Sequence, residues 1–235
     1  MNFFIEALNW LVDPTNHVGD GAIGVRVLQH LGFTAVTLVF ASAIAIPIGF
    51  LIGHTGRGRG LAVAVSGALR AIPTLGLLTI VALWVGIGLD APYVALTVLA
   101  IPPILAGAYT GFQAIDRATV DAARAVGMSE GQIVRLVEIP LGLPLLIGGL
   151  RSATLQIVAT ATLAAYVADF GLGRFLFTGL KTRDYGEMLG GSILVILLAL
   201  ALEGAFALVR ILVVPRGVTA GRPTDIRASL KELAR

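Results

Sequence analysis

Three ionisable side chains lie in or near long apolar stretches, where a charge requires an explanation. They are Arg70, Arg151 and Glu203, and a charge at the centre of a membrane costs roughly 2.5–3.5 kcal/mol on insertion scales. Glu203 is expected either to pair with Arg70 or Arg151 or to act as a proton-relay carboxylate. We favour the structural pairing because one acid without a second relay group is weak evidence for proton transfer. The two arginines either line a polar vestibule or extend their guanidinium groups to the interface.

Other catalytic and ligand-binding patterns are missing from the chain. There is no cysteine, which excludes disulfides and thiol nucleophiles, and no Gly-x-x-x-x-Gly-Lys-Ser/Thr sequence to hold ATP phosphates. His17, His30 and His54 lie in different segments, so we expect exposed or interfacial histidines and not a metal site. The sequence therefore predicts no catalytic residue, no bound metal and no bound cofactor.

Residues 116–140 carry the most detailed local pattern in the chain. Residues 118–126 predict a short helix with Asp116 as its N-cap, and Gly127 is placed to end that helix in the left-handed conformation. A Ser-x-x-Gln capping box at residues 129–132 begins a second short helix. The segment is therefore expected to be ordered.

The second short helix has an apolar face. Ile133, Leu136 and Val137 lie on this face, Glu138 lies off it, and Pro140 is expected to end the helix. An ordered loop that merely covers the bundle would also explain the segment. However, an apolar face outside the membrane needs a covering surface, so we favour a soluble partner protein that binds it.

The composition places these elements in a membrane. Hydrophobic residues make up 57% and charged residues 13% of the chain, against about 25% charged residues in soluble domains. The net charge of +3 is spread between apolar runs, which argues against a nucleic-acid-binding patch. Five apolar runs are long enough to cross a bilayer. The predicted spans are 33–53, 61–89, 92–112, 143–167 and 187–209.

Prolines and glycines within the spans indicate how the helices pack. Pro102 and Pro103 in the third span are expected to kink or break it, inside a bundle where neighbours satisfy the freed backbone groups. The GxxxG spacings at 49–53, 107–111 and 186–190 are interpreted as close helix packing.

The distribution of the 17 basic residues predicts the orientation. With the N-terminus outside, eleven of them fall in inside segments and four in outside segments, as the positive-inside rule requires. Residues 1–32 are then an outer-face amphipathic segment, 33–213 the membrane domain and 214–235 a cytoplasmic basic tail. The N-terminal helix is expected either to lie in the interface or to pack on its neighbours. The tail either forms a short capped helix or frays.

Several positions of the 116–140 segment match a known pattern. Asp121-Ala122-Ala123, Gly127 and Val137-Glu138-Ile139-Pro140 keep the spacing Glu-Ala-Ala, three residues, Gly, nine residues, Ile-x-Leu-Pro. The segment thus resembles the "EAA" loop of binding-protein-dependent ABC importer permeases, with Asp for Glu, Val for Ile and Ile for Leu. The resemblance implies a coupling helix that sits in a groove of a cytoplasmic ATPase. The implied ATPase-coupling residues are Asp121, Ala122, Ala123, Gly127, Ile133, Leu136, Val137 and Pro140.

The resemblance extends over roughly residues 33 to 190. The stretches 69–75, 148–154, 159–164 and 171–173 look like the osmoprotectant branch, whose members import glycine betaine, carnitine, choline or proline betaine. Where that branch tends to have Gly-Ala-Gly, this chain has Ala168-Asp169-Phe170. The candidate pathway or gate residues are Arg70, Pro73, Arg151, Thr154, Thr160, Phe170, Gly171, Gly173 and Glu203.

The resemblance also implies the fold and the partners. The chain is expected to be an all-α integral membrane protein with five transmembrane helices of the type I ABC importer permease kind, N-terminus outside and C-terminus inside. The expected partners in a bacterial-type cell membrane are two copies of a cytoplasmic ATPase, a second permease and an extracytoplasmic substrate-binding protein. The ATPase would bind ATP and Mg, and the second permease is favoured as a different chain. The alternative is an ATP-independent secondary carrier or channel subunit.

Overall fold

The computed structural model describes residues 2–213, and the predicted basic tail at 214–235 lies outside them. All secondary structure in the described range is helical, which confirms the predicted all-α class. The α-helices are α1 (Phe3–Val12), α2 (Ile23–Thr55), α3 (Arg59–Ala71), α4 (Thr74–Val85), α5 (Asp90–Gln113), α6 (Arg117–Ala125), α7 (Glu130–Ile133), α8 (Ile139–Ala161), α9 (Gly173–Thr182) and α10 (Tyr185–Val213). The turns of other helix types are η1 (Pro14–His17), η2 (Val134–Glu138), which is a π-turn, and η3 (Thr162–Tyr166).

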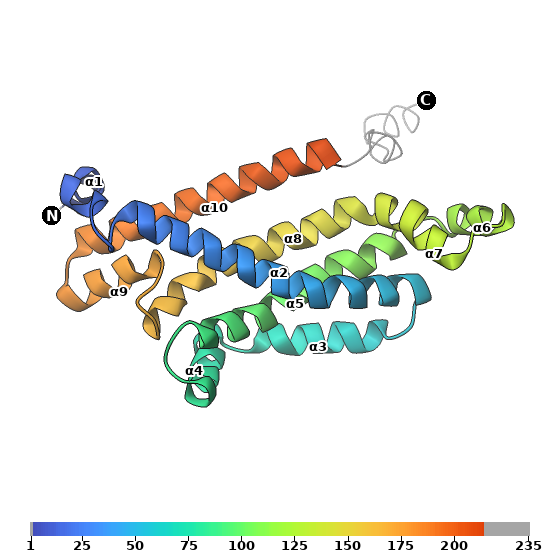
Figure 1. The fold of residues 1–235 in the computed structure, drawn as a ribbon, viewed down its shortest axis with the longest axis horizontal. Helices are drawn as coiled ribbons and strands as arrows, with labels where there is room; N and C mark the ends of the chain where they lie inside the picture. The colour runs from blue at the N-terminus through green and yellow to red at the C-terminus, as the bar shows by residue number, and fades with distance from the viewer. Residues whose placement is uncertain (1, 214–235) are drawn as a thin grey trace, which may run out of the picture.

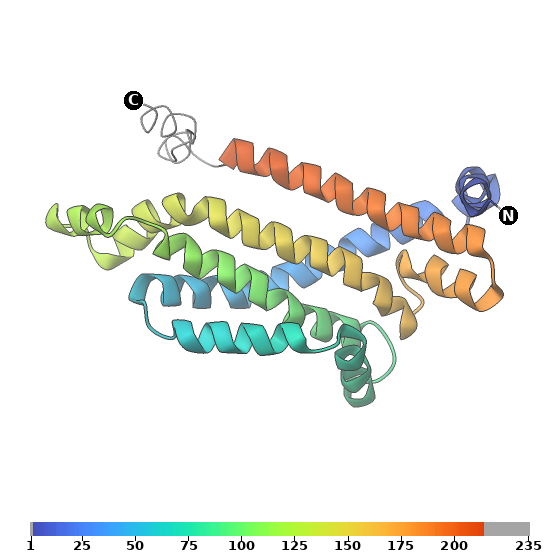
Figure 2. The same ribbon diagram turned by 180° about the vertical axis from the view of Figure 1, so that it is seen from behind.

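Four helical stretches within residues 2–213 are long and apolar enough to cross a membrane. They are α2, α5, the continuous helix Glu130–Tyr166 that contains α8, and α10. α3 and α4 qualify together as a fifth span only across an 88° bend, so the predicted span over 61–89 is not one straight helix. Pro73 explains the bend, because a residue before proline avoids the helical region and Ile72 is extended, with ψ 125°. α4 consequently lies across the direction of α3 (Figures 1 and 2).

Helix α5 lies between α2 and α8 and forms the centre of the bundle (Figure 1). Pro102 and Pro103 are buried inside one continuous helix, so the predicted alternative of a break at these prolines is wrong. Enclosure by neighbouring helices is what allows a membrane helix to keep proline in its interior. α2 begins at Ile23, well before the predicted start of the first span at residue 33.

Glycines allow the central helices to approach closely. A Cβ added to Gly49 on α2 would overlap Ala108 on α5, and one added to Gly107 on α5 would lie 2.7 Å from the carbonyl oxygen of Leu145 on α8. Gly190 on α10 leaves room for an aromatic ring of α1 in the same way. The interpretation of the three GxxxG spacings as close packing is confirmed.

Helix α1 packs against α9 and α10. The ring of Trp10 lies edge-on to Phe175 with centroids 4.9 Å apart, and Phe3 contacts Tyr185 at 5.4 Å. The side chain of Phe4 on the opposite face is 67% exposed. Of the two alternatives for the N-terminal helix, the structure supports packing on neighbours and also leaves an apolar face uncovered.

The two ends of the bundle are built from different elements. Figure 1 shows α6 and α7 at one end and α1 and α9 at the other. We call residues 116–138 the loop end, and we call α1, η3, α9 and the segment 167–172 between η3 and α9 the α9 end.

Candidate functional site

The first helix of the loop end is set by local contacts. The Asp116 carboxylate accepts a hydrogen bond from the Ala118 N–H at 3.0 Å and caps α6, as predicted. Gly127 has φ +87°, which confirms the left-handed position expected after the helix. Its N–H donates to the Arg124 carbonyl at 3.0 Å and closes the turn.

The second helix of the loop end begins as predicted and ends differently. The Ser129–Gln132 capping box is present, with the Ser129 N–H donating to Gln132 Oε1 at 2.8 Å. However, Pro140 does not end the helix, because α7 continues through the π-turn η2 into α8. Pro140 lies directly after the π-turn inside this continuous helix, and such a local π adjustment is one way that a membrane helix accommodates a proline. The loop end is therefore joined without interruption to a membrane-spanning helix.

The apolar face of the second helix is covered mainly by the first. Ile133 is fully buried in a cluster with Val120 and Ala123 of α6, and Val137 packs against that cluster. Only Leu136 of the three predicted face residues is exposed, at 66%. The interpretation that this face needs a partner outside the membrane is corrected for Ile133 and Val137, because α6 covers them.

Exposed charges join the two helices of the loop end. Arg124 donates to Glu130 through Nε at 2.8 Å and to Asp121 through Nη1 at 3.0 Å. The hydrogen bond that Arg124 donates to the Glu130 carboxylate raises the pKa of Arg124 further above its usual range. Ala122, the central alanine of the matched motif, is exposed on the same helix.

A contact that the sequence did not predict connects the loop end to α2. His54, in the last turn of α2, places Nδ1 2.7 Å from Oε2 of Glu138 and Nε2 3.2 Å from Glu130. The Glu138 side chain is 3% exposed and the His54 side chain 19%, so the expectation of a lone exposed or interfacial histidine is wrong here. The only sequence feature that pointed to this contact was Glu138, which lies off the apolar face of its helix.

The charged residues of the predicted pathway separate into a pair and a single arginine. Arg151 on α8 donates from Nε to Glu203 on α10 at 2.6 Å. The structure thus bears out the pairing of Glu203 with Arg151 and not with Arg70, which is exposed at the end of α3. Pro73 lies beyond Arg70, at the bend between α3 and α4.

The two threonines of the predicted pathway bond within their own helix. Thr154 Oγ1 donates to the Leu150 carbonyl at 2.9 Å, and Thr160 Oγ1 donates to the Gln156 carbonyl at 2.7 Å. Thr154 is buried, so its hydroxyl does not face an open path within this chain.

Residues of α2 hold the segment at 167–172 in place. Arg26 Nη2 lies 2.7 Å from Oδ1 of Asp169, and Gln29 accepts the Gly171 N–H at 3.0 Å. The buried ring of His30 accepts the Leu172 N–H at Nδ1. These three α2 side chains were missed by sequence reasoning, because they lie 142 or more residues from their partners.

The predicted gate residues lie within this same segment. Phe170 packs against Phe33 on α2 with ring centroids 6.0 Å apart. Gly171 has φ +64° and lies against His30, while a Cβ on Gly173 would overlap the Thr162 backbone. His30 is 1% exposed and its Nε2 lies 3.0 Å from the Val158 carbonyl, so the expectation of an exposed or interfacial histidine is also wrong here. Within residues 2–213, no group of three or more metal-binding side chains gathers.

Comparison with known proteins gives one family. Residues 45–216 match the family described as binding-protein-dependent transport system inner membrane component. The chain is 28% identical over 198 residues to the glycine betaine/carnitine/choline transport system permease protein OpuCB of Bacillus subtilis, covering 84% of this chain and 91% of that protein. It is 30% identical over 172 residues to OpuCD, which bears the same transport-system name in that organism, covering 73% and 75%.

The fold also matches a solved transporter. The inward-facing MetNI methionine ABC transporter contains a chain that superposes with a TM-score of 0.69 at 27% identity. The match covers 81% of this chain and 95% of the other.

Proposed function

Because the chain belongs to the family of binding-protein-dependent transport system inner membrane components, we propose that it is the membrane-spanning permease subunit of an ATP-driven importer of osmoprotectants. The observation that carries the proposal is the loop end: a capped α6, a left-handed Gly127 and a capping box, continuous with α8. This construction suits a lever that passes motion from a soluble motor into the membrane. No ATP-binding pattern occurs in the chain, so ATP and Mg belong to the partner ATPase.

The proposed orientation puts the loop end in the cytoplasm. The positive-inside rule favours an outside N-terminus and an inside C-terminus. α1 and α9 then lie on the outer face of the cell membrane. The broken pair α3–α4 counts as the fifth crossing in this arrangement.

The ATPase is proposed to bind the exposed surface of the loop end. Asp121 and Ala122 are exposed there, and Val126 and Leu136 present apolar side chains that are 78% and 66% exposed. Ala123, Ile133 and Val137 have a different role in this scheme, since they fasten α6 to the second helix. Displacement of α6 would therefore move the second helix with it.

Two connections carry that movement into the membrane. The π-turn joins the second helix directly to α8, and the His54–Glu138 contact joins it to α2. ATP binding by the ATPase pair would thereby tilt α2 and α8 together. Closing and reopening the ATPase pair would open the path alternately outward and inward.

The proposed solutes are quaternary ammonium compounds such as glycine betaine, carnitine or choline. The support is the name of the OpuCB and OpuCD permeases, which match over most of this chain. This chain forms half of the path, and a second permease supplies the other half. Because both OpuCB and OpuCD bear one transport-system name, we favour a second, different permease chain.

The alternative is a secondary carrier that works without ATP. It would need an intramembrane acid that exchanges protons, and Glu203 is the candidate. Its ion pair with Arg151 favours a structural role, because the pair joins α10 to α8. That pairing gives the carrier hypothesis little support.

Purification of the tagged chain from its own membranes in mild detergent tests the proposal. We expect an ABC ATPase, a second permease and a substrate-binding protein among the subunits identified by mass spectrometry. A matched preparation of the Gly127→Val variant should insert in the membrane but retain less ATPase. A pure single-chain preparation that transports solute in ATP-free vesicles would contradict the proposal.

A further inference from the structure

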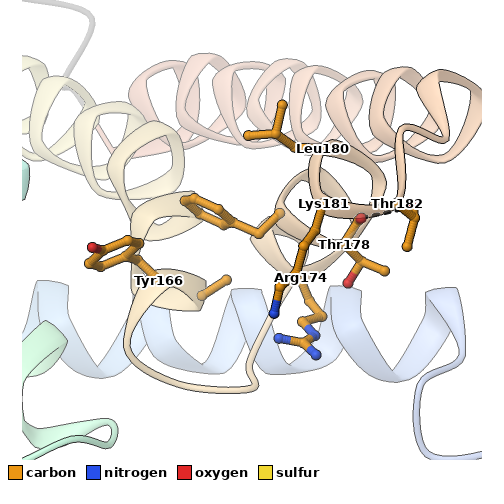
Figure 3. A pocket seen from close by; sticks show the side chains of 8 residues that line it. Tyr166, Arg174, Thr178, Leu180, Lys181 and Thr182 are labelled. Carbon is orange, nitrogen blue, oxygen red and sulfur yellow. Dashed lines mark hydrogen bonds between the residues drawn. The ribbon is translucent and has the colours of Figure 1, made fainter.

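A pocket opens at the α9 end, between α9 and the preceding turn η3 (Figure 3). Its volume is about 400 Å³, which lies within the range of pockets that bind small molecules. Most of the lining comes from α9, and Tyr166 of η3 forms the opposite wall. The proposed orientation places this pocket on the outer face, where solute arrives.

One face of α9 supplies two positive charges to the pocket. Arg174 and Lys181 are seven residues apart, which places them on the same side of the helix. Their side chains extend in the same direction from α9 (Figure 3). Arg174 contacts Asp169 at 3.3 Å, but that carboxylate already pairs with Arg26. Within residues 2–213, Lys181 has no acidic partner within 4 Å, so the pocket retains positive charge.

Two aromatic rings also line the pocket, Phe177 from α9 and Tyr166 from η3. Phe177 and Tyr166 have ring centroids 6.0 Å apart at an angle of 51°, and both line the pocket. Aromatic faces attract quaternary ammonium groups through cation–π interaction. Thr178, between the two cations, adds a hydroxyl that can bond to a carboxylate oxygen.

We infer that this pocket is an outer-face binding site for small zwitterions that carry both a carboxylate and a quaternary ammonium group. The carboxylate lies between Arg174 and Lys181, and the ammonium group lies against Tyr166 and Phe177. The inference rests on the proposed function, and it adds a solute site on the permease itself. It also divides the candidate solutes: glycine betaine and carnitine carry a carboxylate and fit, whereas choline carries only the positive group and meets two like charges.

Equilibrium binding of radiolabelled solutes to the purified complex in nanodiscs tests the inference. The complex keeps the partners that co-purify with the chain, but the substrate-binding protein is washed away, so that its own site does not contribute. The variants are Lys181→Gln, which removes a pocket charge, and Phe177→Leu, which removes an aromatic face. Arg183→Gln is the matched control, because Arg183 follows the same helix and does not line the pocket.

We expect glycine betaine and carnitine to bind and choline to bind more weakly. Lys181→Gln should weaken glycine betaine binding by about fivefold, the effect of losing one partly exposed ion pair, and should leave choline binding unchanged or improved. Phe177→Leu should weaken the binding of both solutes. Arg183→Gln should behave like the wild type.

Three results would overturn the inference. One is the absence of solute binding to the wild-type complex, and another is equal binding of glycine betaine and choline with equal effects of Lys181→Gln and Arg183→Gln. The third is unchanged solute binding in Lys181→Gln combined with weaker capture of the substrate-binding protein, which would make the pocket a protein-docking surface. ATP-driven uptake by the same preparations separates this inference from the proposed function. Uptake without pocket binding would refute only the proposed solute site. Pocket binding without ATP-driven uptake would refute only the proposed importer function.

Discussion

The loop end and the α9 end are both ordered, but they are held together over very different sequence distances. Within the loop end, hydrogen bonds such as Asp116–Ala118 and Arg124–Glu130 join residues two to six positions apart, and the long-range contact is the one that His54 of α2 makes with Glu138. At the α9 end they join residues 142 or 143 positions apart, as in Gln29–Gly171 and Arg26–Asp169.

This difference matches the different tasks proposed for the two ends. Local bonds allow the loop end to keep its shape while it moves as one body with the ATPase. Long-range hydrogen bonds fix the segment 167–172 to α2, so that a tilt of α2 would displace this segment. His54 at one end of α2 and Arg26 at the other make this helix the link between the two ends.

The largest expected effect comes from breaking the local geometry of the loop end. Gly127→Val places a β-branched residue at φ +87°, which costs about 1–3 kcal/mol of backbone strain. We expect ATP-driven uptake to fall to background, because the second helix no longer leaves α6 in the right direction. Uptake into membrane vesicles, with insertion checked by immunoblot, measures this.

A matched substitution separates strain from bulk at this position. No atom lies within 4 Å of a Cβ added at residue 127, so a side chain fits there if its backbone tolerates positive φ. Gly127→Asn should therefore retain much of the uptake, since asparagine adopts the left-handed conformation more readily. Normal uptake by the Gly127→Val variant would contradict the proposed role of this turn in coupling.

A smaller effect is expected when the long-range bond of the α9 end is broken, and it should be asymmetric. Arg26 is 9% exposed and Asp169 is 64% exposed. Asp169→Ala leaves a buried guanidinium without its carboxylate, at a cost of about 1–3 kcal/mol in stability. Arg26→Met removes the buried charge and leaves Asp169 in water, so it should cost less. Melting temperatures of the purified variants in detergent test this order, with Asp169→Asn as the control that keeps an acceptor.

Equal destabilisation by Asp169→Ala and Arg26→Met would contradict the asymmetry. It would mean that leaving the buried Arg26 guanidinium unpaired costs no more stability than leaving the exposed Asp169 carboxylate unpaired. The tie between α2 and the segment 167–172 would then be weaker than we describe.

The smallest expected effect comes from the exposed charges of the loop end. Arg124→Gln removes the contacts with Asp121 and Glu130, but exposed ion pairs contribute little to stability. We expect the melting temperature to stay within error of the wild type at moderate salt. A large drop that persists at high salt would show that the charges, and not the Ile133 cluster, hold the loop end together.

The sequence predicted the loop end far better than the α9 end, and the reason is physical. The Asp116 cap, the left-handed Gly127 and the Ser129 capping box are local patterns, and all three are confirmed. The contacts of Arg26 and His30 depend on which helices become neighbours in the folded bundle, and no local pattern reports that.

Some local patterns were nevertheless misinterpreted. Pro140 was expected to end a helix, but it lies inside a continuous helix, directly after the π-turn η2. Pro73 was included within the predicted span 61–89, although the helices before and after it, α3 and α4, meet at an 88° bend. The same residue type acts differently in each case, because the outcome depends on its position within the helix and on its neighbours. The apolar face of Ile133 was recognised, but its partner in α6 required tertiary packing.

Transport by the purified complex in proteoliposomes tests the central claim most directly. Radiolabelled glycine betaine and the substrate-binding protein are supplied on the α9 side, and ATP is supplied on the loop side. The account predicts uptake that requires ATP and is lost in the Gly127→Val variant. Uptake that proceeds equally without ATP, or that collapses with the proton gradient and with Glu203→Gln, would contradict it and favour a secondary carrier.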